Sequence, residues 1–206
     1  MIGTDRIGGA TDFALQEMLP QLGLIPGKDV QLIATGLTNS ADRVLLIHRG
    51  KIDATLAVLY NLLKMELQGY TVTILADLLE HGVYTTGGDL MTYRQFLKQN
   101  REMAKAFLKA ICEAVWLGRQ DKELALRVYR KYLKTNESIL LESLYKNYVL
   151  GTIQTKPYPE PKSMQRTIDQ LAATTPHLKG QKVGNFIDDS LLREIDKEGF
   201  FARLYK

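Results

Sequence analysis

Residues 7–12, Ile-Gly-Gly-Ala-Thr-Asp, are the stretch of this sequence best suited to hold a ligand. Gly8 and Gly9 let the backbone approach a bound group closely, and Thr11 can cap the helix predicted to run on to Leu22. Unpaired N–H groups at such a helix start, with the positive end of the helix dipole, attract a carboxylate, sulfonate, phosphate or ring carbonyl. Because Asp12 adds a negative charge to the same turn, we expect a weakly charged or neutral ligand rather than a dianion. An ordinary strand-to-helix turn is the competing interpretation of this stretch.

Other chemistry-bearing residues are scattered. His48, His81 and His177 are far apart in the sequence, which makes a metal site improbable, and the single cysteine, Cys112, excludes an internal disulfide and a cysteine-based zinc cluster. The apolar surroundings of Cys112 predict a small buried core residue. The sequence has no phosphate-binding loop, no third glycine of a dinucleotide fingerprint and no nucleophile elbow at any serine. We therefore predict no catalytic residue, no metal and no cofactor.

The net charge of +4 is unevenly distributed over the 206 residues. Residues 1–88 carry 6 Lys and Arg against 9 Asp and Glu, whereas residues 89–206 carry 21 against 14. Four of the later basic residues recur at helical spacing opposite apolar ones, which indicates a solvated helix face rather than a nucleic-acid-binding surface: Lys98, Arg101, Lys105 and Lys109. No apolar run approaches the length of a membrane span, so this segment is not expected to insert into a membrane. The start lacks a basic-then-apolar export signal, so the protein is either cytosolic or missing its front part.

The elements that must position the glycine-rich turn form an alternating pattern. Short extended segments at 2–4, 30–35, 52–56 and 70–75 are separated by helices, which predicts a mainly parallel sheet with right-handed crossovers. Ligands of such sheets bind beyond the carboxyl ends of the strands. The loops there are 6–11, 36–40 and the segment after residue 56.

From residue 90 onward the pattern changes to successive amphipathic helices with no strand for them to cover. Asp121 and Asn136 are the predicted caps of two of these helices. The exposed apolar stripes need a partner, which is either the other helices in a bundle or a sheet supplied from elsewhere.

A series of short motifs resembles the type II periplasmic binding proteins, in particular the group of sulfonate-, taurine- and pyrimidine-precursor-binding subunits of ABC importers. Each motif is weak alone, but their order and spacing match from end to end. They are Gly-Thr-Asp-Arg-Ile-Gly-Gly-Ala-Thr-Asp-Phe-Ala-Leu at 3–15, Leu-Gly-Leu at 22–24, Lys-Asp-Val at 28–30, Ala-Asp-Arg at 41–43, Gly-Lys-Ile-Asp-Ala at 50–54, Gly-Tyr at 69–70, Leu-Ala-Asp at 75–77, Phe-Leu-Lys at 96–98, Ala-Phe-Leu-Lys-Ala at 106–110 and Lys-Pro-Tyr-Pro at 156–159. The last three motifs are Asp-Asp-Ser-Leu-Leu at 188–192, Gly-Phe at 199–200 and Leu-Tyr at 204–205.

The resemblance implies an α/β fold of the periplasmic-binding-protein type II class and a function in uptake. Residues 1–87 would be the second, α/β lobe, and residues 88–206 the helical return segment of the first lobe. The export signal and most of the first-lobe sheet would then be absent from this sequence. The implied protein is not an enzyme but an extracytoplasmic, for example periplasmic, solute-binding subunit. Its partners would be a small-molecule ligand and the ABC transporter permease in the membrane.

The resemblance also assigns ligand-binding positions. Gly8, Gly9, Ala10 and Thr11 match the helix-start loop that hydrogen-bonds the ligand, while Asp12 is expected to support the turn. Tyr60 would form an apolar or stacking wall. Tyr84 lies where a ligand contact or a hinge is plausible, and a half-buried strand aromatic is the competing interpretation.

Two other classes share features of this design. A synthase of the pyrimidine-precursor family has the same fold, but it carries a cysteine-rich segment that Cys112 alone cannot supply. The effector-binding domain of a LysR-type transcription regulator is also two-lobed, but it would need a DNA-binding segment ahead of Met1 and lacks the long helical tail.

Overall fold

The computed structural model describes residues 1–83 and 89–206, and the chain divides into two compact units. Unit 1 comprises Met1–Gly88 and Pro161–Asn185, and unit 2 comprises Asp89–Glu160 and Phe186–Lys206. Residues 161–185 therefore belong with the first unit, whereas the sequence placed them in the helical segment 88–206. The assignment of these segments to two lobes stays a prediction.

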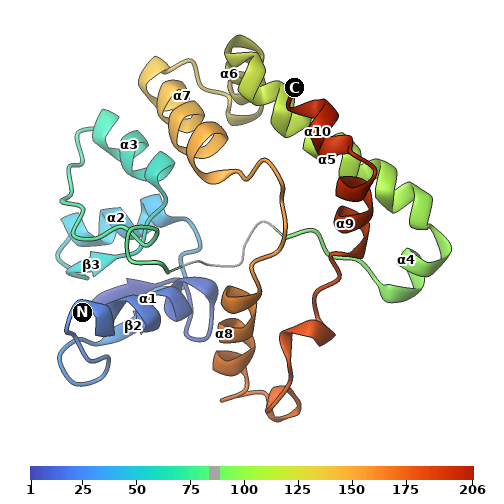
Figure 1. Ribbon diagram of the computed structural model, residues 1–206. Helices are drawn as coiled ribbons and strands as arrows, with labels where there is room; N and C mark the ends of the chain where they lie inside the picture. The colour runs from blue at the N-terminus through green and yellow to red at the C-terminus, as the bar shows by residue number, and fades with distance from the viewer. Residues whose placement is uncertain (84–88) are drawn as a thin grey trace. The chain divides into compact units, whose positions relative to one another are not determined.

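Unit 1 contains a three-stranded parallel sheet in the order β2-β1-β3, which confirms the predicted α/β class (Figure 1). The strands are β1 (Ile2–Thr4), β2 (Leu32–Ala34) and β3 (Ala54–Thr55), with Ile2 opposite Leu32 on one side and Ala54 on the other. Gly3 allows the central strand to pack closely on Ile52, because a Cβ at this position would lie 2.6 Å from Ile52 Cδ1 and that side chain would have to move.

The predicted fourth strand at 70–75 is wrong. Within the described part of the chain, these residues pair with no strand, and Ile74 and Leu75 expose 62% and 80% of their surface. An apolar alternating segment needs a neighbouring strand edge and a face to bury, and it has neither here.

Helices surround the sheet of unit 1. They are α1 (Ala10–Gln21), α2 (Ser40–His48), α3 (Leu59–Leu67), α8 (Pro161–Leu171) and the short 3-10 turns η2 (Pro176–Leu178) and η3 (Val183–Asn185). One face of α1 packs on the sheet through Leu15 and Leu19, which cluster with Ile2. A second apolar cluster joins α1 to the segment before residue 84 through Ala14, Met18 and Val83. These two clusters fix the start of α1 against the end of β1.

Helix α8 belongs to unit 1 through polar contacts with α1. Arg166 forms an ion pair with Glu17, and Gln170 Nε2 donates a hydrogen bond of 3.4 Å to the Phe13 carbonyl. These contacts bridge about 150 residues of sequence, which is why local patterns alone did not reveal them.

The described residues of unit 2 form helices joined by loops, with no strand among them. Its helices are α4 (Arg94–Gln99), α5 (Arg101–Gln120), α6 (Lys122–Leu133), α7 (Ser138–Leu144), the π-helix η1 (Tyr145–Thr152), α9 (Ser190–Lys197) and α10 (Phe200–Leu204). One core cluster joins α5 to α9 and α10 around Cys112, Ile195 and Phe201, so the predicted burial of Cys112 is confirmed. Another joins α6, α7 and η1 around Leu126 and Leu141.

The predicted helix caps of unit 2 differ in outcome. Asp121 caps α6 as expected, because its Oδ1 accepts a hydrogen bond of 2.8 Å from the Leu124 amide. Asn136 does not cap α7, which begins at Ser138 with Glu137 in the N-cap position. Helix α7 is followed directly by the π-helix η1, and Arg119 donates to the carbonyls of Leu150 in its last turn and of Ile153, the residue after it.

Helix α5 leaves part of its apolar surface exposed, as the amphipathic pattern predicted for helices without a sheet. Two open hollows of about 540 and 290 Å³ flank Ala114 on this helix. Of the helices in the described residues, none is long and apolar enough to cross a bilayer.

Candidate functional site

The glycine-rich turn leads directly from β1 into α1. Gly8 has a φ of +74°, a left-handed conformation that glycine adopts without strain. Gly9 is the N-cap residue and makes no side-chain cap bond, so the helix begins at Ala10. The prediction that Thr11 caps the helix is therefore wrong, since Thr11 is already the second helical residue. The two glycines let the helix begin two residues earlier than a cap at Thr11 would.

Two of the four amides in the predicted ligand loop are occupied within the protein. The Gly8 N–H donates to Asp12 Oδ2 at 2.9 Å, and the Gly9 N–H donates to the Arg6 carbonyl at 3.2 Å. The N–H groups of Ala10 and Thr11 have no acceptor among the described residues. These are orphan donors of a helix start, and Ala10 is exposed. The donors available to a ligand are thus the amides of Ala10 and Thr11 rather than those of the glycines.

Asp12 supports the turn, as predicted. Its side chain is buried, with 1% of the residue exposed, and Oδ2 accepts from both Gly8 N–H and Gln16 Nε2 at 2.9 Å. The second oxygen, Oδ1, has no hydrogen-bond partner among the described residues. A carboxylate on the third residue of α1 thus closes the loop back onto the helix start.

The Asp5 carboxylate lies at the end of β1, beside the same helix start. Burial alone would raise the pKa of Asp5, but hydrogen bonds from the Arg6 amide and from the Thr4 and Thr11 hydroxyls outweigh it and lower this pKa below its usual range. Asp5 is therefore ionised at neutral pH, and its Oδ1 accepts a hydrogen bond of 3.2 Å from the Thr4 hydroxyl. This position offers a negative charge next to the free amides of Ala10 and Thr11.

Arg43 joins the loops that follow the three strands. It is 3% exposed and lies on the buried face of α2 with Ser40 and Val44. Its guanidinium donates to the Leu37 and Thr38 carbonyls after β2 at 2.6 and 3.2 Å. It also donates to Thr55 Oγ1 and to the Leu56 carbonyl, both at 2.9 Å, at the end of β3.

The central strand joins this network through Thr55, whose hydroxyl donates to the Gly3 carbonyl at 2.8 Å. Burial lowers the pKa of the Arg43 guanidinium, and the charges of Asp5 and Asp42 oppose that effect. The guanidinium stays protonated at neutral pH, because its ordinary value lies far above that range. One buried cation therefore ties together the carboxyl ends of all three strands.

In the sequence, Arg43 is noted only as part of the Ala-Asp-Arg motif at 41–43. A signal was available, because residues 40, 43, 44 and 47 follow the i, i+3, i+4, i+7 spacing of a buried helix face. A charged residue on such a face needs internal partners, and backbone carbonyls of adjacent loops supply them.

A second set of contacts fixes the loop after β2 to the start of α3. Asn61 Nδ2 donates to Asn39 Oδ1 at 2.9 Å and to Ser40 Oγ at 2.8 Å. The Val58 amide also donates to Ser40 Oγ, at 3.4 Å. The loops after β2 and β3 are therefore pre-organised rather than free to rearrange.

The two predicted tyrosines have different outcomes. Tyr60 is half-buried in the first turn of α3, which follows β3, so the order of the strands places its loop at the same sheet edge as Ala10 and Thr11. Its contact with a ligand stays a prediction. Tyr84 lies outside the described residues.

The arrangement at this edge is suited to binding. It offers two amide donors, an ionised carboxylate and the half-buried Tyr60, on loops held by Arg43, Asn61 and Asp12. Over residues 1–83 and 89–206, no group of three or more His, Cys, Asp and Glu side chains could hold a metal ion. The predicted binding loop is thus part of a rigid, polar sheet edge.

Comparison with protein families gives one match. Residues 2–118, more than half of the chain, match the family model described as NMT1/THI5 like. Searches of curated proteins and of solved structures return no match. The family match includes the whole of the sheet edge described above and continues through most of α5.

Proposed function

The chain belongs to the NMT1/THI5-like family, and we propose that it is part of a solute-binding subunit of an ABC importer. The family indicates a small-molecule-binding protein of the substrate-binding type. The proposed ligand is a small polar organic solute such as a sulfonate, taurine or a pyrimidine precursor. We place its action outside the cytoplasm, where the loaded subunit would deliver the solute to a membrane permease.

The observation that carries this proposal is the pair of free amides at the start of α1. The N–H groups of Ala10 and Thr11 point from a helix start, where the dipole favours an acceptor group, and the described residues supply no acceptor for them. The ionised Asp5 beside Thr11 favours a ligand that also carries a donor or a positive charge, which a simple dianion lacks.

The proposed binding residues follow from this geometry. Ala10 and Thr11 donate to the ligand, Gly8 and Gly9 shape the turn that frees those amides, and Tyr60 stacks against an apolar or ring portion. Tyr84 is retained as a proposed ligand contact from the sequence alone. All of these positions except Tyr84 lie on loops or helix starts of the same sheet edge.

We propose binding rather than catalysis. A family member acting as a synthase needs reactive groups near its ligand, and the one cysteine of this chain lies in unit 2 rather than at the sheet edge of unit 1. Burial, reinforced by the charge of Glu113, raises the pKa of the Cys112 thiol, which keeps it protonated and weakly nucleophilic. Analysis of the incubated chain for newly formed pyrimidine distinguishes the two roles, because a synthase makes the compound, whereas a binding protein releases only what it was given.

Isothermal titration calorimetry of the chain with taurine, ethanesulfonate and 4-aminopyrimidine tests the proposal. We expect at least one probe to bind, and Gly9→Ala to weaken that binding about tenfold, equivalent to about 1.4 kcal/mol. A Cβ at Gly9 would lie 2.9 Å from Arg6 Cγ and 3.2 Å from the Arg6 carbonyl, so the turn must shift.

Gly184→Ala is the matched control. A Cβ at Gly184 meets nothing within 4 Å, and this glycine has an ordinary φ, so its substitution leaves the turn unchanged. We expect this variant to bind the same probe as the wild type does. Absence of binding by every probe, or equal loss in the Gly9→Ala and Gly184→Ala variants, would contradict the proposed function.

A further inference from the structure

The net charge of the chain is confined to unit 2. Of the 27 Lys and Arg and 23 Asp and Glu of the chain, unit 1 contains ten of each and is therefore neutral. The remaining 17 basic and 13 acidic residues give unit 2 the whole charge of +4. A surface that concentrates this excess is the natural place to look for an anionic partner.

Four cations lie on one face of α6 and its C-cap residue. Arg127, Arg130, Lys131 and Lys134 follow the i, i+3, i+4, i+7 spacing that aligns side chains along a helix. Seven residues of helix place the first and last of them about 10 Å apart along the axis. Arg127, Lys131 and Lys134 are exposed and Arg130 is half-buried. We call these four residues the α6 basic face.

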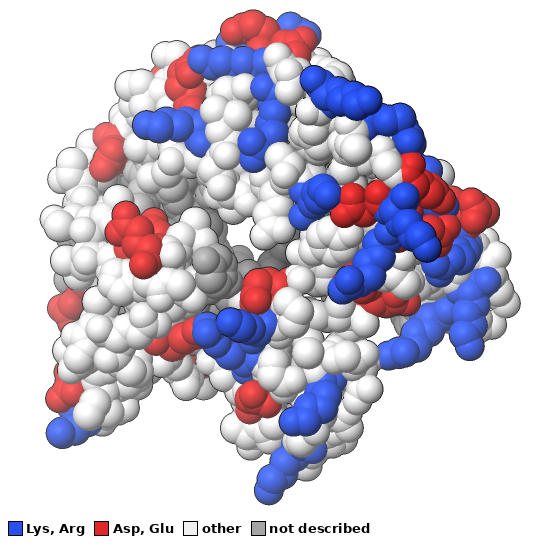
Figure 2. Space-filling view, in the orientation of Figure 1, with Lys and Arg blue, Asp and Glu red and all other residues white. Residues whose placement is uncertain are grey.

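The charges of the α6 basic face are not neutralised within the described parts of the protein. None of the four forms an ion pair with a residue in 1–83 or 89–206. The basic residues of α5 differ, because Arg101, Lys105 and Lys109 pair with Glu194 of α9 and with Glu198, the C-cap residue of that helix. Figure 2 shows blue and red side chains intermixed over α5 and α9, and blue side chains together with some red ones over the α6 and α7 part of unit 2.

Apolar and aromatic side chains border the α6 basic face. Tyr132 is 73% exposed and Val128 is 45% exposed, one turn apart on the same side of the helix. The Lys131 ammonium lies 5.5 Å from the Tyr132 ring centroid. The opposite side of α6 is occupied, since Ala125 and Leu126 are buried in the core with Tyr129 against them. The exposed side thus combines positive charge with an amphipathic ring.

From this combination we infer that the α6 basic face binds the anionic headgroups of a lipid bilayer. The four cations lie in a row along a helix whose other side packs on its own unit. All four can therefore contact a flat, negatively charged surface at the same time. Tyrosine favours the headgroup level of a bilayer, where its ring is partly apolar and its hydroxyl is solvated. A nucleic-acid backbone shares the negative charge but offers no such apolar layer for Val128, and it is therefore the less suitable partner. The contact is peripheral and involves no insertion of a helix.

This surface adds a membrane contact to the proposed solute binding and does not depend on it. The α6 basic face is in unit 2, whereas the proposed ligand site is in unit 1. A surface contact of this kind would raise the local concentration of the chain at a membrane, with strong dependence on ionic strength.

Flotation of the full chain with phosphatidylcholine vesicles containing phosphatidylglycerol tests the inference. We expect binding that falls steeply with added salt and is lost on vesicles of phosphatidylcholine alone. Because each basic residue near an anionic surface contributes about fivefold in binding, Lys131→Gln with Lys134→Gln should weaken binding about 30-fold.

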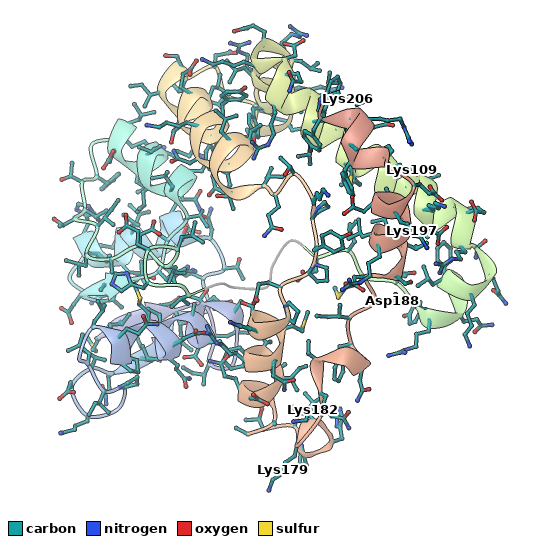
Figure 3. All side chains as sticks on the ribbon, viewed as in Figure 1. Lys109, Lys179, Lys182, Asp188, Lys197 and Lys206 are labelled. Atoms are coloured by element: carbon teal, nitrogen blue, oxygen red, sulfur yellow. The ribbon has the colours of Figure 1, made fainter. Side chains whose placement is uncertain are left out.

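The control removes the same charge elsewhere. Lys179 and Lys182 are exposed in unit 1, and Figure 3 marks both in the segment that follows α8. We expect Lys179→Gln with Lys182→Gln to change vesicle binding less than threefold. Unfolding of each double variant by heat checks that α6 is intact, since the last-turn basic residues also stabilise the helix end.

Three results would overturn the inference. They are equal loss in the two double variants, binding that is the same on neutral and anionic vesicles, and binding to duplex DNA in the absence of any binding to anionic vesicles.

Discussion

Arg43 is the residue whose replacement should disturb unit 1 most. Its guanidinium is almost fully buried and donates to three backbone carbonyls and to the Thr55 hydroxyl. Arg43→Met removes all four bonds and leaves those acceptors without a partner, while it also removes the cost of burying a charge. Counting about 1 kcal/mol for each lost bond and offsetting part of it for the charge, we expect a destabilisation of about 3 kcal/mol. Arg43→Lys keeps the charge and one or two of the bonds, so we expect about 2 kcal/mol.

Urea unfolding followed by circular dichroism measures this loss. With a slope of about 2 kcal/mol per M, the Arg43→Met midpoint should fall by about 1.5 M. Tryptophan fluorescence is the wrong probe for it, because the single tryptophan, Trp116, is in α5 of unit 2. Hydrogen exchange adds the local measurement, and amides at 36–39 and 56–58 should exchange about 100-fold faster in the variant.

Arg49 provides the matched control. It is the C-cap residue of the same helix, is exposed, and makes no side-chain hydrogen bond with the described residues. Arg49→Met should change the free energy of unfolding by no more than about 0.5 kcal/mol. If Arg43→Met cost less than about 1 kcal/mol, or if only one of the two loops exchanged faster, Arg43 would not join the strand ends as the structure indicates.

Three further predictions concern other contacts. Asp12→Ala should destabilise unit 1 by about 2 kcal/mol in urea unfolding, because the Gly8 amide and Gln16 lose the buried carboxylate that accepts from both, and an unchanged midpoint would contradict the role of Asp12. Phe201→Ala should lower the free energy of unfolding of unit 2 by about 3–5 kcal/mol, since the residue is 1% exposed in the α5–α9–α10 core. Unfolding followed by tryptophan fluorescence measures this loss, and a value below about 1 kcal/mol would refute that packing. Hydrogen bonds from Lys105 lower the pKa values of Glu194 and Glu198 below 4.5, so their stabilisation is complete above pH 4.5 and is lost as the pH falls through the lowered values. The melting temperature of unit 2 should therefore drop on acidification, and less so in Glu194→Gln with Glu198→Gln, whereas the exposed control Glu113→Gln should keep the wild-type profile.

Several elements were predictable because local signals agreed with their packing. Helix α3 lies between the extended segments predicted at 52–56 and 70–75, as the alternating pattern indicated, and its apolar helical pattern ends two residues before a glycine. Strand β1 also has its predicted bounds, and burial of Cys112 followed from its apolar neighbours. In each case the segment has one favourable conformation and a face that the rest of its unit covers.

The errors share a physical cause, which is that a segment's partner was not visible in its own sequence. The alternating residues 70–75 suit a strand, but the described chain gives them no edge to pair with. Thr11 suits an N-cap, but the glycines start the helix earlier and Asp12 takes the role of closing the loop. The grouping of residues 161–185 with unit 1 was likewise not visible locally, because it depends on contacts with α1 that span most of the chain, while the assignment of the segments to two lobes stays a prediction.

The candidate site was predictable in position but not in detail. The glycine-rich turn does open a helix at the carboxyl end of the central strand, as its residue types indicated. Which amides are free could not be predicted, because it depends on the acceptors that Asp12 and Arg6 supply. The part played by Arg43 requires three loops to meet, and only the folded chain brings them together.

The central claim is that the amides of Ala10 and Thr11 hold a captured solute, and amide chemical shifts of the isotope-labelled chain test it most directly. Titration with whichever of taurine, ethanesulfonate and 4-aminopyrimidine binds should move the Ala10 and Thr11 signals most, while Gly8 and Gly9, whose amides are bonded within the protein, move less. Shifts that leave Ala10 and Thr11 unchanged while other parts of the chain respond would contradict the account.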